Sequence, residues 1–323
     1  MPILDSCFRP AWWLRGGHAQ TVWPALIRRH PRLAIDWERL ELDDGDFLDL
    51  AWSGPRDGPV VLFFHGLQGG IGSHYATGIM HRLNERGFRV CLMHFRGCGR
   101  EPNRLPISYH SGKTDDPQRL LEHVERRGGQ PPFGAVGVSL GGNVLLKWLG
   151  EQGAASPLRR AVAISVPFQL DAAARRLERG LSRLYQHHLV RSMRASYRAK
   201  FSRIPSPLEV DVERLQTFRQ FDDRVTAPLH GFTGVDDYYA RCSSRQFIPS
   251  IRVPTLILHA RNDPFMFPDT APTADELPDS VWLEIPEAGG HVGFVGGRLP
   301  GLADYYAERR VAEWMDAASL SVG

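Results

Sequence analysis

The chain has 323 residues, 42% of them hydrophobic and 23% charged, with a formal net charge of +3. This composition is typical of a soluble globular protein with a substantial core, and the small net charge gives no general case for a nucleic-acid partner. The length suits one large α/β domain with an insertion, or two domains, and does not choose between them.

The N-terminal sequence and the spacing of the cysteines predict a cytoplasmic protein. Residues 1–20 lack a basic start followed by a long apolar stretch, so a signal peptide is not expected. Nowhere does the chain approach the ~18 consecutive apolar residues of a transmembrane helix. The four cysteines form no C-x-x-C pair, so the sequence predicts neither a disulfide framework nor a zinc site.

From residue 37 onward, predicted strands alternate with predicted helices. Apolar and polar side chains alternate on both sides of Asp44-Gly45, which is typical of a β-hairpin over residues 37–52. Short continuous apolar runs predict strands that are buried on both faces. These runs occupy residues 59–66, 88–95, 133–139, 159–168, 255–260 and 280–287.

Helices are predicted between these strands from apolar spacing and capping residues. Three of them are expected at residues 75–86, 140–152 and about 302–317. A fourth is expected to begin with Asp116 as its N-cap and Pro117 as its first residue. The alternation predicts an α/β fold with a mostly parallel sheet that is covered by helices on both faces.

Residues 169–249, between two of the predicted strands, are expected to form a helical cap. From Asp171 to Arg203 the segment has two acidic residues and nine basic ones. The basic residues are Arg175, Arg176, Arg179, Arg183, Arg191, Arg194, Arg198, Lys200 and Arg203. The pattern predicts a basic amphipathic helix or a pair of helices. Its basic face is either a solvated surface or a contact for an anionic surface such as lipid headgroups.

The cap divides the expected core into two parts. Residues 1–168 are the predicted N-terminal part, with an extension over residues 1–36, and residues 250–323 are the predicted C-terminal part.

Residues 137–141 read G-V-S-L-G and match the G-x-S-x-G nucleophile elbow around Ser139. The motif requires a strand before the serine and a helix after it, and both are predicted here. Small residues permit the sharp turn that exposes the hydroxyl, while the helix N-terminus lies beneath the negative charge that develops. Ser139 is therefore the predicted nucleophile.

A serine hydroxyl needs a base, and the base needs an orienting carboxylate. In the elbow arrangement these residues follow in the order Ser, acid, His, each just past a strand. Asp263 lies three residues beyond one predicted strand, and His291 lies in the glycine-rich loop after the next. The sequence thus predicts the triad Ser139, Asp263 and His291. Asp269 and Glu287 are weaker rival acids, since Asp269 lies farther along its loop and Glu287 belongs to a strand.

An oxyanion hole is expected from two backbone N–H groups. One is that of Leu140, directly after the nucleophile, and the other is that of Leu67 in the loop HGLQGG. Neither a metal nor an organic cofactor is predicted. The stretch S-G-K-T at residues 111–114 lacks the first glycine of a phosphate-binding loop, because Ile107 stands there, and His187-His188 has no carboxylate at metal-ligand spacing.

The chain resembles the YheT-like branch of the α/β-hydrolase superfamily, which includes bacterial proteins and eukaryotic hydrolases of medium-chain acyl esters. Besides the elbow, the resemblance rests on GGHAQTVWP, HGLQGG, FRGCGREPNRLPISYHSGKTDD and FDDRVTAPLHGF, and it covers nearly the whole chain. It implies the α/β-hydrolase fold, hydrolysis of carboxylic esters and a triad on Ser139, Asp263 and His291. The membrane anchor of many eukaryotic relatives is not expected here.

The interpretation that follows is a serine carboxylesterase that acts through an acyl-enzyme on short- to medium-chain acyl esters. Acyl transfer to an alcohol by the same residues, and a binding protein that keeps only the fold, remain as alternatives. A serine at the elbow disfavours dehalogenases and epoxide hydrolases, which place aspartate there. An apolar stripe of Leu177, Leu181, Leu184 and Tyr185 is expected to roof the acyl pocket, and residues 109–116 are interpreted as a brace for the elbow.

Overall fold

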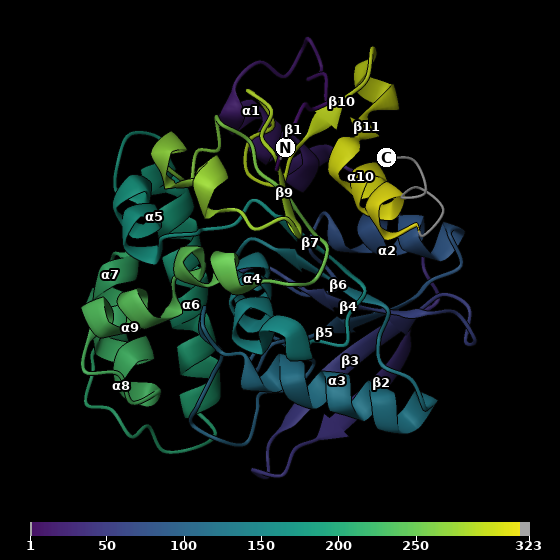
Figure 1. The fold of residues 1–323 in the computed structure, drawn as a ribbon. Helices are drawn as coiled ribbons and strands as arrows, with labels where there is room; N and C mark the ends of the chain where they lie inside the picture. Colours follow the sequence, from purple (N-terminus) through teal and green to yellow (C-terminus); the bar gives the residue numbers. More distant parts are fainter. Residues whose placement is uncertain (1, 317–323) are drawn as a thin grey trace.

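A computed structural model describes residues 2–316 and has one large sheet between two layers of helices (Figure 1). The sheet order is β1-β9-β8-β7-β6-β4-β5-β3-β2. Its strands are β1 (Ile3–Leu4), β2 (Asp36–Glu41), β3 (Phe47–Ser53), β4 (Val60–Phe64), β5 (Arg89–Met93), β6 (Gly134–Val138), β7 (Arg160–Ile164), β8 (Thr255–Leu258) and β9 (Val281–Glu284). The predicted α/β class is confirmed.

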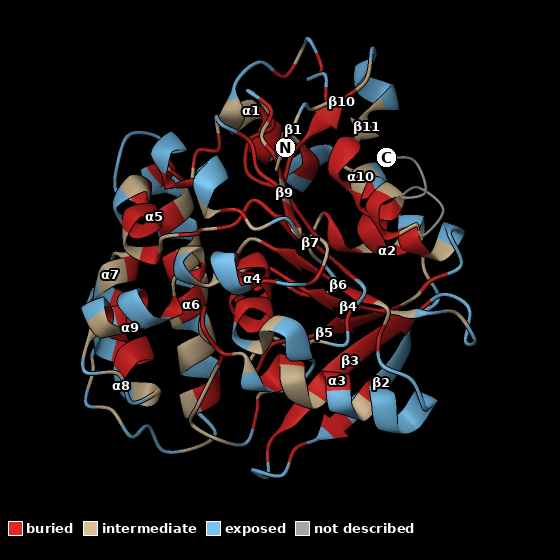
Figure 2. Ribbon diagram, viewed as in Figure 1, coloured by how far each residue is buried: buried red, intermediate tan, exposed pale blue. Residues whose placement is uncertain are grey.

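The direction of the strands follows their sequence pattern. The alternating segment forms the antiparallel hairpin β2–β3, and β3 also pairs antiparallel with β5. All the short apolar runs pair in parallel with one another. Parallel strands are buried on both faces because the crossover helices cover both sides, which explains why these runs are apolar without alternation. Figure 2 shows the resulting band of buried residues through the middle of the molecule.

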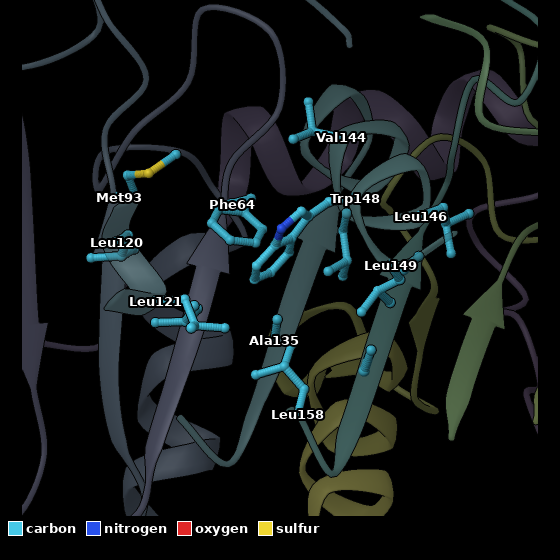
Figure 3. Close-up of a cluster of buried hydrophobic side chains, with 14 of the residues drawn as sticks. Phe64, Met93, Leu120, Leu121, Ala135, Val144, Leu146, Trp148, Leu149 and Leu158 are labelled. Carbon is cyan, nitrogen blue, oxygen red and sulfur yellow. The ribbon is translucent and has the colours of Figure 1, made fainter. Parts of the chain in front are cut away.

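Helices complete the two layers around the sheet. They are α2 (Ala76–Glu85), α3 (Asp115–Gly128), α4 (Leu140–Gln152) and α10 (Tyr306–Met315). Helix α1 (Gly17–Ile27) packs instead against the segment around Val295. Successive residues of β4 point to opposite layers: Phe64 packs with the α3–α4 layer, and Phe63 packs with the α2–α10 layer. In the first layer, the ring of Trp148 from α4 stands edge-on to Phe64 at 6.1 Å (Figure 3).

The chain between β7 and β8 forms a helical insertion beside the sheet (Figure 1). Its helices are α5 (Leu170–Leu177), α6 (Ser182–Phe201), α7 (Phe218–Phe221), α8 (Ala227–Leu229) and α9 (Val235–Cys242), with a π-helical turn at Asp222–Thr226 between α7 and α8. The sequence left open one basic helix or a pair, and the structure has the pair α5 and α6. Among residues 2–316, no helix is long and apolar enough to cross a membrane.

Two predicted helix starts are wrong. Helix α3 begins at Asp115 with Thr114 as N-cap, so Asp116 lies inside the helix. The carboxylate of Asp116 is instead engaged by the buried guanidinium of Arg96, at 2.7 and 2.9 Å. Helix α10 begins at Tyr306 because the preceding residues form a short 3-10 turn and pair with another strand. Residue 317, the predicted end of that helix, lies outside the described residues.

The N-terminal extension is joined to the sheet. Strand β1 pairs in parallel with β9 at the edge of the sheet, and a small antiparallel pair, β10 (Val295–Gly296) with β11 (Asp304–Tyr305), lies near it. Helix α1 is tied to α10 by a buried ion pair between Arg28 and Glu308. Segments from both ends of the chain therefore surround the loop after β9.

Candidate active site

Ser139 occupies a strained turn between β6 and α4. Its φ angle is +52°, which is uncommon for a residue with a side chain. The glycines at either side are sterically required: a Cβ on Gly141 would lie 2.3 Å from the carbonyl oxygen of Phe64, and one on Gly137 would lie 2.5 Å from that of Gly141. The missing side chain of Gly141 lets the turn pack against the exit of β4, and that of Gly137 lets the turn close on itself.

The three predicted triad residues come together in a linear array. His291 Nε2 lies 3.0 Å from Ser139 Oγ, and His291 Nδ1 lies 2.8 Å from Asp263 Oδ2. An ionised carboxylate only accepts hydrogen bonds, so Nδ1 carries the proton and Nε2 is left to accept from the serine hydroxyl. The rival acids Asp269 and Glu287 are exposed, and Glu287 pairs with Arg261 instead.

Asp263 is buried and remains in its charged form. Burial opposes ionisation, but the electrostatic interaction and hydrogen bond with His291, with smaller contributions from His259 and the N–H of Phe265, hold the pKa of Asp263 below its usual value. The backbone N–H of Phe265 donates to Asp263 Oδ1 at 2.8 Å. The Phe265 ring also stacks on the imidazole of His291, with centroids 3.9 Å apart and planes only 2° apart. Asp263 thus fixes the edge of the imidazole of His291 and Phe265 covers its face, so the ring cannot rotate freely.

The loop that carries His291 is held by residues of the N-terminal extension. The N–H of His291 donates to Thr21 Oγ1 at 2.9 Å. The fully buried amide of Gln20 donates to the carbonyl of Val295 and accepts from its N–H. Both residues belong to the string GGHAQTVWP, to which the sequence assigns no role. A glutamine and a threonine on the buried face of an otherwise ordinary helix are the signal that identifies them.

The two predicted oxyanion donors line the same cavity as Ser139. Within residues 2–316, neither the N–H of Leu67 nor that of Leu140 donates to a protein acceptor. The loop before Leu67 lies directly against the nucleophile, since a Cβ on Gly66 would be 3.3 Å from Ser139 Cβ. The N–H of Gly66 donates to the hydroxyl of Tyr75 at 2.7 Å, which fixes this approach.

His65 stabilises the loop as a neutral ring. Burial lowers its pKa to about 3. Its Nε2 accepts from the N–H of Phe95 at 3.1 Å, so Nδ1 carries the proton and donates to the carbonyl of Gly66 at 2.7 Å. The histidine of the HGLQGG string is therefore a structural link between the exits of β4 and β5.

The segment 109–116 contacts the elbow helix, in line with its interpretation as a brace. Asn143, in the first turn of α4, donates to the carbonyls of Ser111 and Cys242 and accepts from the N–H of Ser244. The side chain is completely buried. A single asparagine thus joins the elbow helix to this segment and to the end of the helical insertion.

Ser139 opens into a cavity of about 280 Å³ between the core and the helical insertion. Apolar side chains of the insertion form much of its wall, namely Leu170, Ala173, Ala174, Leu177, Leu189, Met193, Phe218 and Phe221. The expected stripe is only partly correct. Leu177 is 5% exposed and lines the cavity, whereas Leu181 and Leu184 are 63% and 69% exposed and lie outside it. Gly180, with φ +54°, separates α5 from α6, so the stripe does not continue on one helix face.

Tyr185 does not line the cavity either. Its ring lies 5.0 Å from that of Phe265, and its hydroxyl lies 3.0 Å from Nδ1 of His18. It connects α6 with α1 and supports the phenylalanine that stacks on His291.

A family profile described as alpha/beta hydrolase fold matches residues 59–297. The chain belongs to this family. It is 41% identical to the candidate esterase YheT of Escherichia coli (strain K12) over 92% of this chain and 89% of that protein, which places it in the YheT-like branch. It is also 29% identical to a monoacylglycerol lipase of Saccharomyces cerevisiae over 84% of this chain and 60% of that protein. The esterase Pf2001 of Pyrococcus furiosus, with a TM-score of 0.56 and 16% identity, has the same fold over 89% of this chain and all of that chain.

Proposed function

We propose that the protein is a serine carboxylesterase that forms an acyl-enzyme on Ser139. The linear array of Ser139, His291 and Asp263 at the wall of an apolar cavity is the observation that carries the proposal. The relatives named above are esterases and lipases, which supports hydrolysis of the esterase and lipase type.

The residues have distinct roles in the proposed reaction. As Ser139 Oγ bonds to the ester carbonyl carbon, His291 Nε2 takes its proton, and Asp263 stabilises the imidazolium. The carbonyl electron pair moves onto oxygen, where the N–H groups of Leu67 and Leu140 donate to it. When the carbonyl reforms, the C–O bond to the alcohol breaks and His291 returns the proton to the leaving alkoxide. Water then enters by the same steps and releases the carboxylic acid.

The helical insertion, residues 169–249, acts in this proposal as a cap that selects short- to medium-chain acyl groups. Its apolar side chains line the cavity beside Ser139, and each buried methylene contributes up to about 0.8 kcal/mol of binding. Such a cavity favours an alkyl chain over a polar substituent.

The outer face of the cap supports contact with an anionic membrane surface by a protein that we place in the cytoplasm. Leu181 and Leu184 are exposed on either side of Arg183, and an exposed apolar pair beside cations is typical of interfacial helices. Sedimentation with vesicles that contain phosphatidylserine should be weaker for the Leu181→Gln/Leu184→Gln variant than for wild type. Equal sedimentation of the two proteins would refute this contact.

The central experiment compares wild type with Ser139→Ala. Wild type should hydrolyse p-nitrophenyl esters from acetate to medium-chain acids and react with a fluorophosphonate probe, whereas the variant should do neither and melt at the same temperature. Turnover by the triad as a unit should fall by about 10⁶. Product analysis with added ethanol separates hydrolysis from acyl transfer. Normal turnover by Ser139→Ala would refute the proposal.

A further inference from the structure

Gln68 directly follows Leu67 and is held by a tyrosine from another loop. Its φ angle is +52°, so the chain bends sharply at this residue. Its backbone N–H donates to the hydroxyl of Tyr109 at 2.8 Å, and its side-chain Nε2 lies 3.1 Å from the same oxygen, to which it also donates. On the other side of Leu67, the N–H of Gly66 donates to the hydroxyl of Tyr75. Leu67 therefore lies between two anchored neighbours.

The other end of the Gln68 side chain reaches the cap. Its Oε1 accepts a hydrogen bond from Ser196 Oγ at 2.6 Å and a longer one from Ser192 Oγ at 3.5 Å. Both serines lie on α6, the longest helix of the described insertion. One amide therefore joins the loop that carries the Leu67 N–H to a helix of the cap.

The same helix contacts the substrate cavity and the opposite side of the site. Leu189 and Met193 of α6 line the cavity. Tyr185, near the start of α6, packs on Phe265, which stacks on His291. Helix α6 thus contacts the cavity for the acyl chain, supports the proposed base through Tyr185, and connects through Gln68 to the predicted oxyanion donor.

We propose that Gln68 is a positioning residue that couples the seating of the cap helix α6 to the oxyanion hole. An acyl chain that packs against Met193 holds α6 in place, and Gln68 then holds the N–H of Leu67 where the oxyanion forms. Chain length should consequently affect kcat as well as binding. This inference rests on the proposed esterase function.

The test uses two variants. Gln68→Met keeps an unbranched side chain but removes every hydrogen bond of the amide, and Ser196→Ala removes only the shorter of its two hydrogen bonds with the cap. Ser202→Ala is the matched control, because this serine directly follows the same helix and its hydroxyl donates to the carbonyl of Ala199. The readouts are kcat and KM for acetate and hexanoate esters, and the affinity for an alkyl trifluoromethyl ketone, whose adduct with a serine carries the oxyanion.

Loss of one neutral hydrogen bond should lower kcat for hexanoate by about three- to tenfold, with KM and the melting temperature nearly unchanged. The affinity for the ketone should fall by the same factor, and the advantage of hexanoate over acetate in kcat should shrink. The double variant Gln68→Met/Ser196→Ala should have the same kcat as Gln68→Met alone, since both substitutions break the same connection between the loop and α6. Ser202→Ala should match wild type.

Unchanged kcat and ketone affinity in both variants would overturn the coupling, as would a loss confined to KM. Fluorophosphonate labelling separates this failure from failure of the proposed function. If wild type is labelled at Ser139 and the two variants retain full kcat, only the role of Gln68 is refuted. If the Ser139→Ala variant turns over esters as wild type does, the proposed function itself is refuted.

Discussion

Replacing Leu177 by tryptophan should shorten the acyl chain that the protein prefers, whereas the same change at Leu181 should not. Leu177 is 5% exposed and lines the cavity beside Ser139, while Leu181, a few residues later in sequence, is 63% exposed outside it. Each buried methylene is worth about 0.8 kcal/mol, or nearly fourfold in kcat/KM. An indole that displaces two methylene positions should therefore cost the longest preferred ester about fifteenfold.

The assay is a kcat/KM profile over p-nitrophenyl esters from acetate to palmitate for wild type and both variants. Leu177→Trp should move the maximum to shorter chains and leave acetate within about twofold, since the first carbons bind next to Ser139. The larger side chain also strains the packing, by about 1–3 kcal/mol, which a thermal melt measures. Identical profiles for the two variants would refute the assignment of Leu177 to the acyl pocket.

Three further predictions concern the acid, the elbow and the cap. Asp263→Asn should lower kcat by about 10⁴ through the wrong histidine tautomer, while the exposed Asp269→Asn should match wild type; the reverse would reassign the acid. Gly141→Ala should destabilise the fold by about 3 kcal/mol or more in denaturant titrations, because its Cβ would meet the Phe64 carbonyl at 2.3 Å, whereas Gly128→Ala, in open space, should be nearly neutral. Burial raises the pKa of Asp222 from 3.8 to about 6, so its cost to stability grows as pH rises from about 4 to 6. Asp222→Asn should therefore raise the free energy of unfolding by up to about 3 kcal/mol above pH 6, seen as a higher melting temperature, and should have little effect near pH 4. A gain in stability that does not depend on pH would contradict this.

The parallel strands and the candidate triad were predictable because both depend on local patterns and on topology. A strand buried on two faces must be apolar throughout, so the run at β4 is recognisable without any partner. Ser139, Asp263 and His291 each follow a strand, and the carboxyl ends of parallel strands meet at one edge of the sheet. Their order along the chain therefore indicates their proximity.

Other features depend on distant contacts that leave little local trace. Strands β1, β10 and β11 have two residues each, too few for any periodicity. Asp116 has the sequence context of an N-cap, but Arg96 engages its carboxylate inside the fold. The apolar spacing from Leu177 to Leu184 is compatible with one helix face, and the break at Gly180 depends on how α5 and α6 pack.

The hydrogen bonds between the N-terminal segment and the loop of His291 join residues that are synthesised at very different times. Thr21 and the N–H of His291 are 270 residues apart, and Gln20 and Val295 are 275 apart. At a synthesis rate of about 5–20 residues per second, these partners leave the ribosome roughly 15 to 55 seconds apart. During that interval Ser139 lacks its proposed base, so we expect the nascent chain to be unreactive. Reaction with a fluorophosphonate should therefore begin only after His291 has left the ribosome, which translation in vitro with timed labelling can follow.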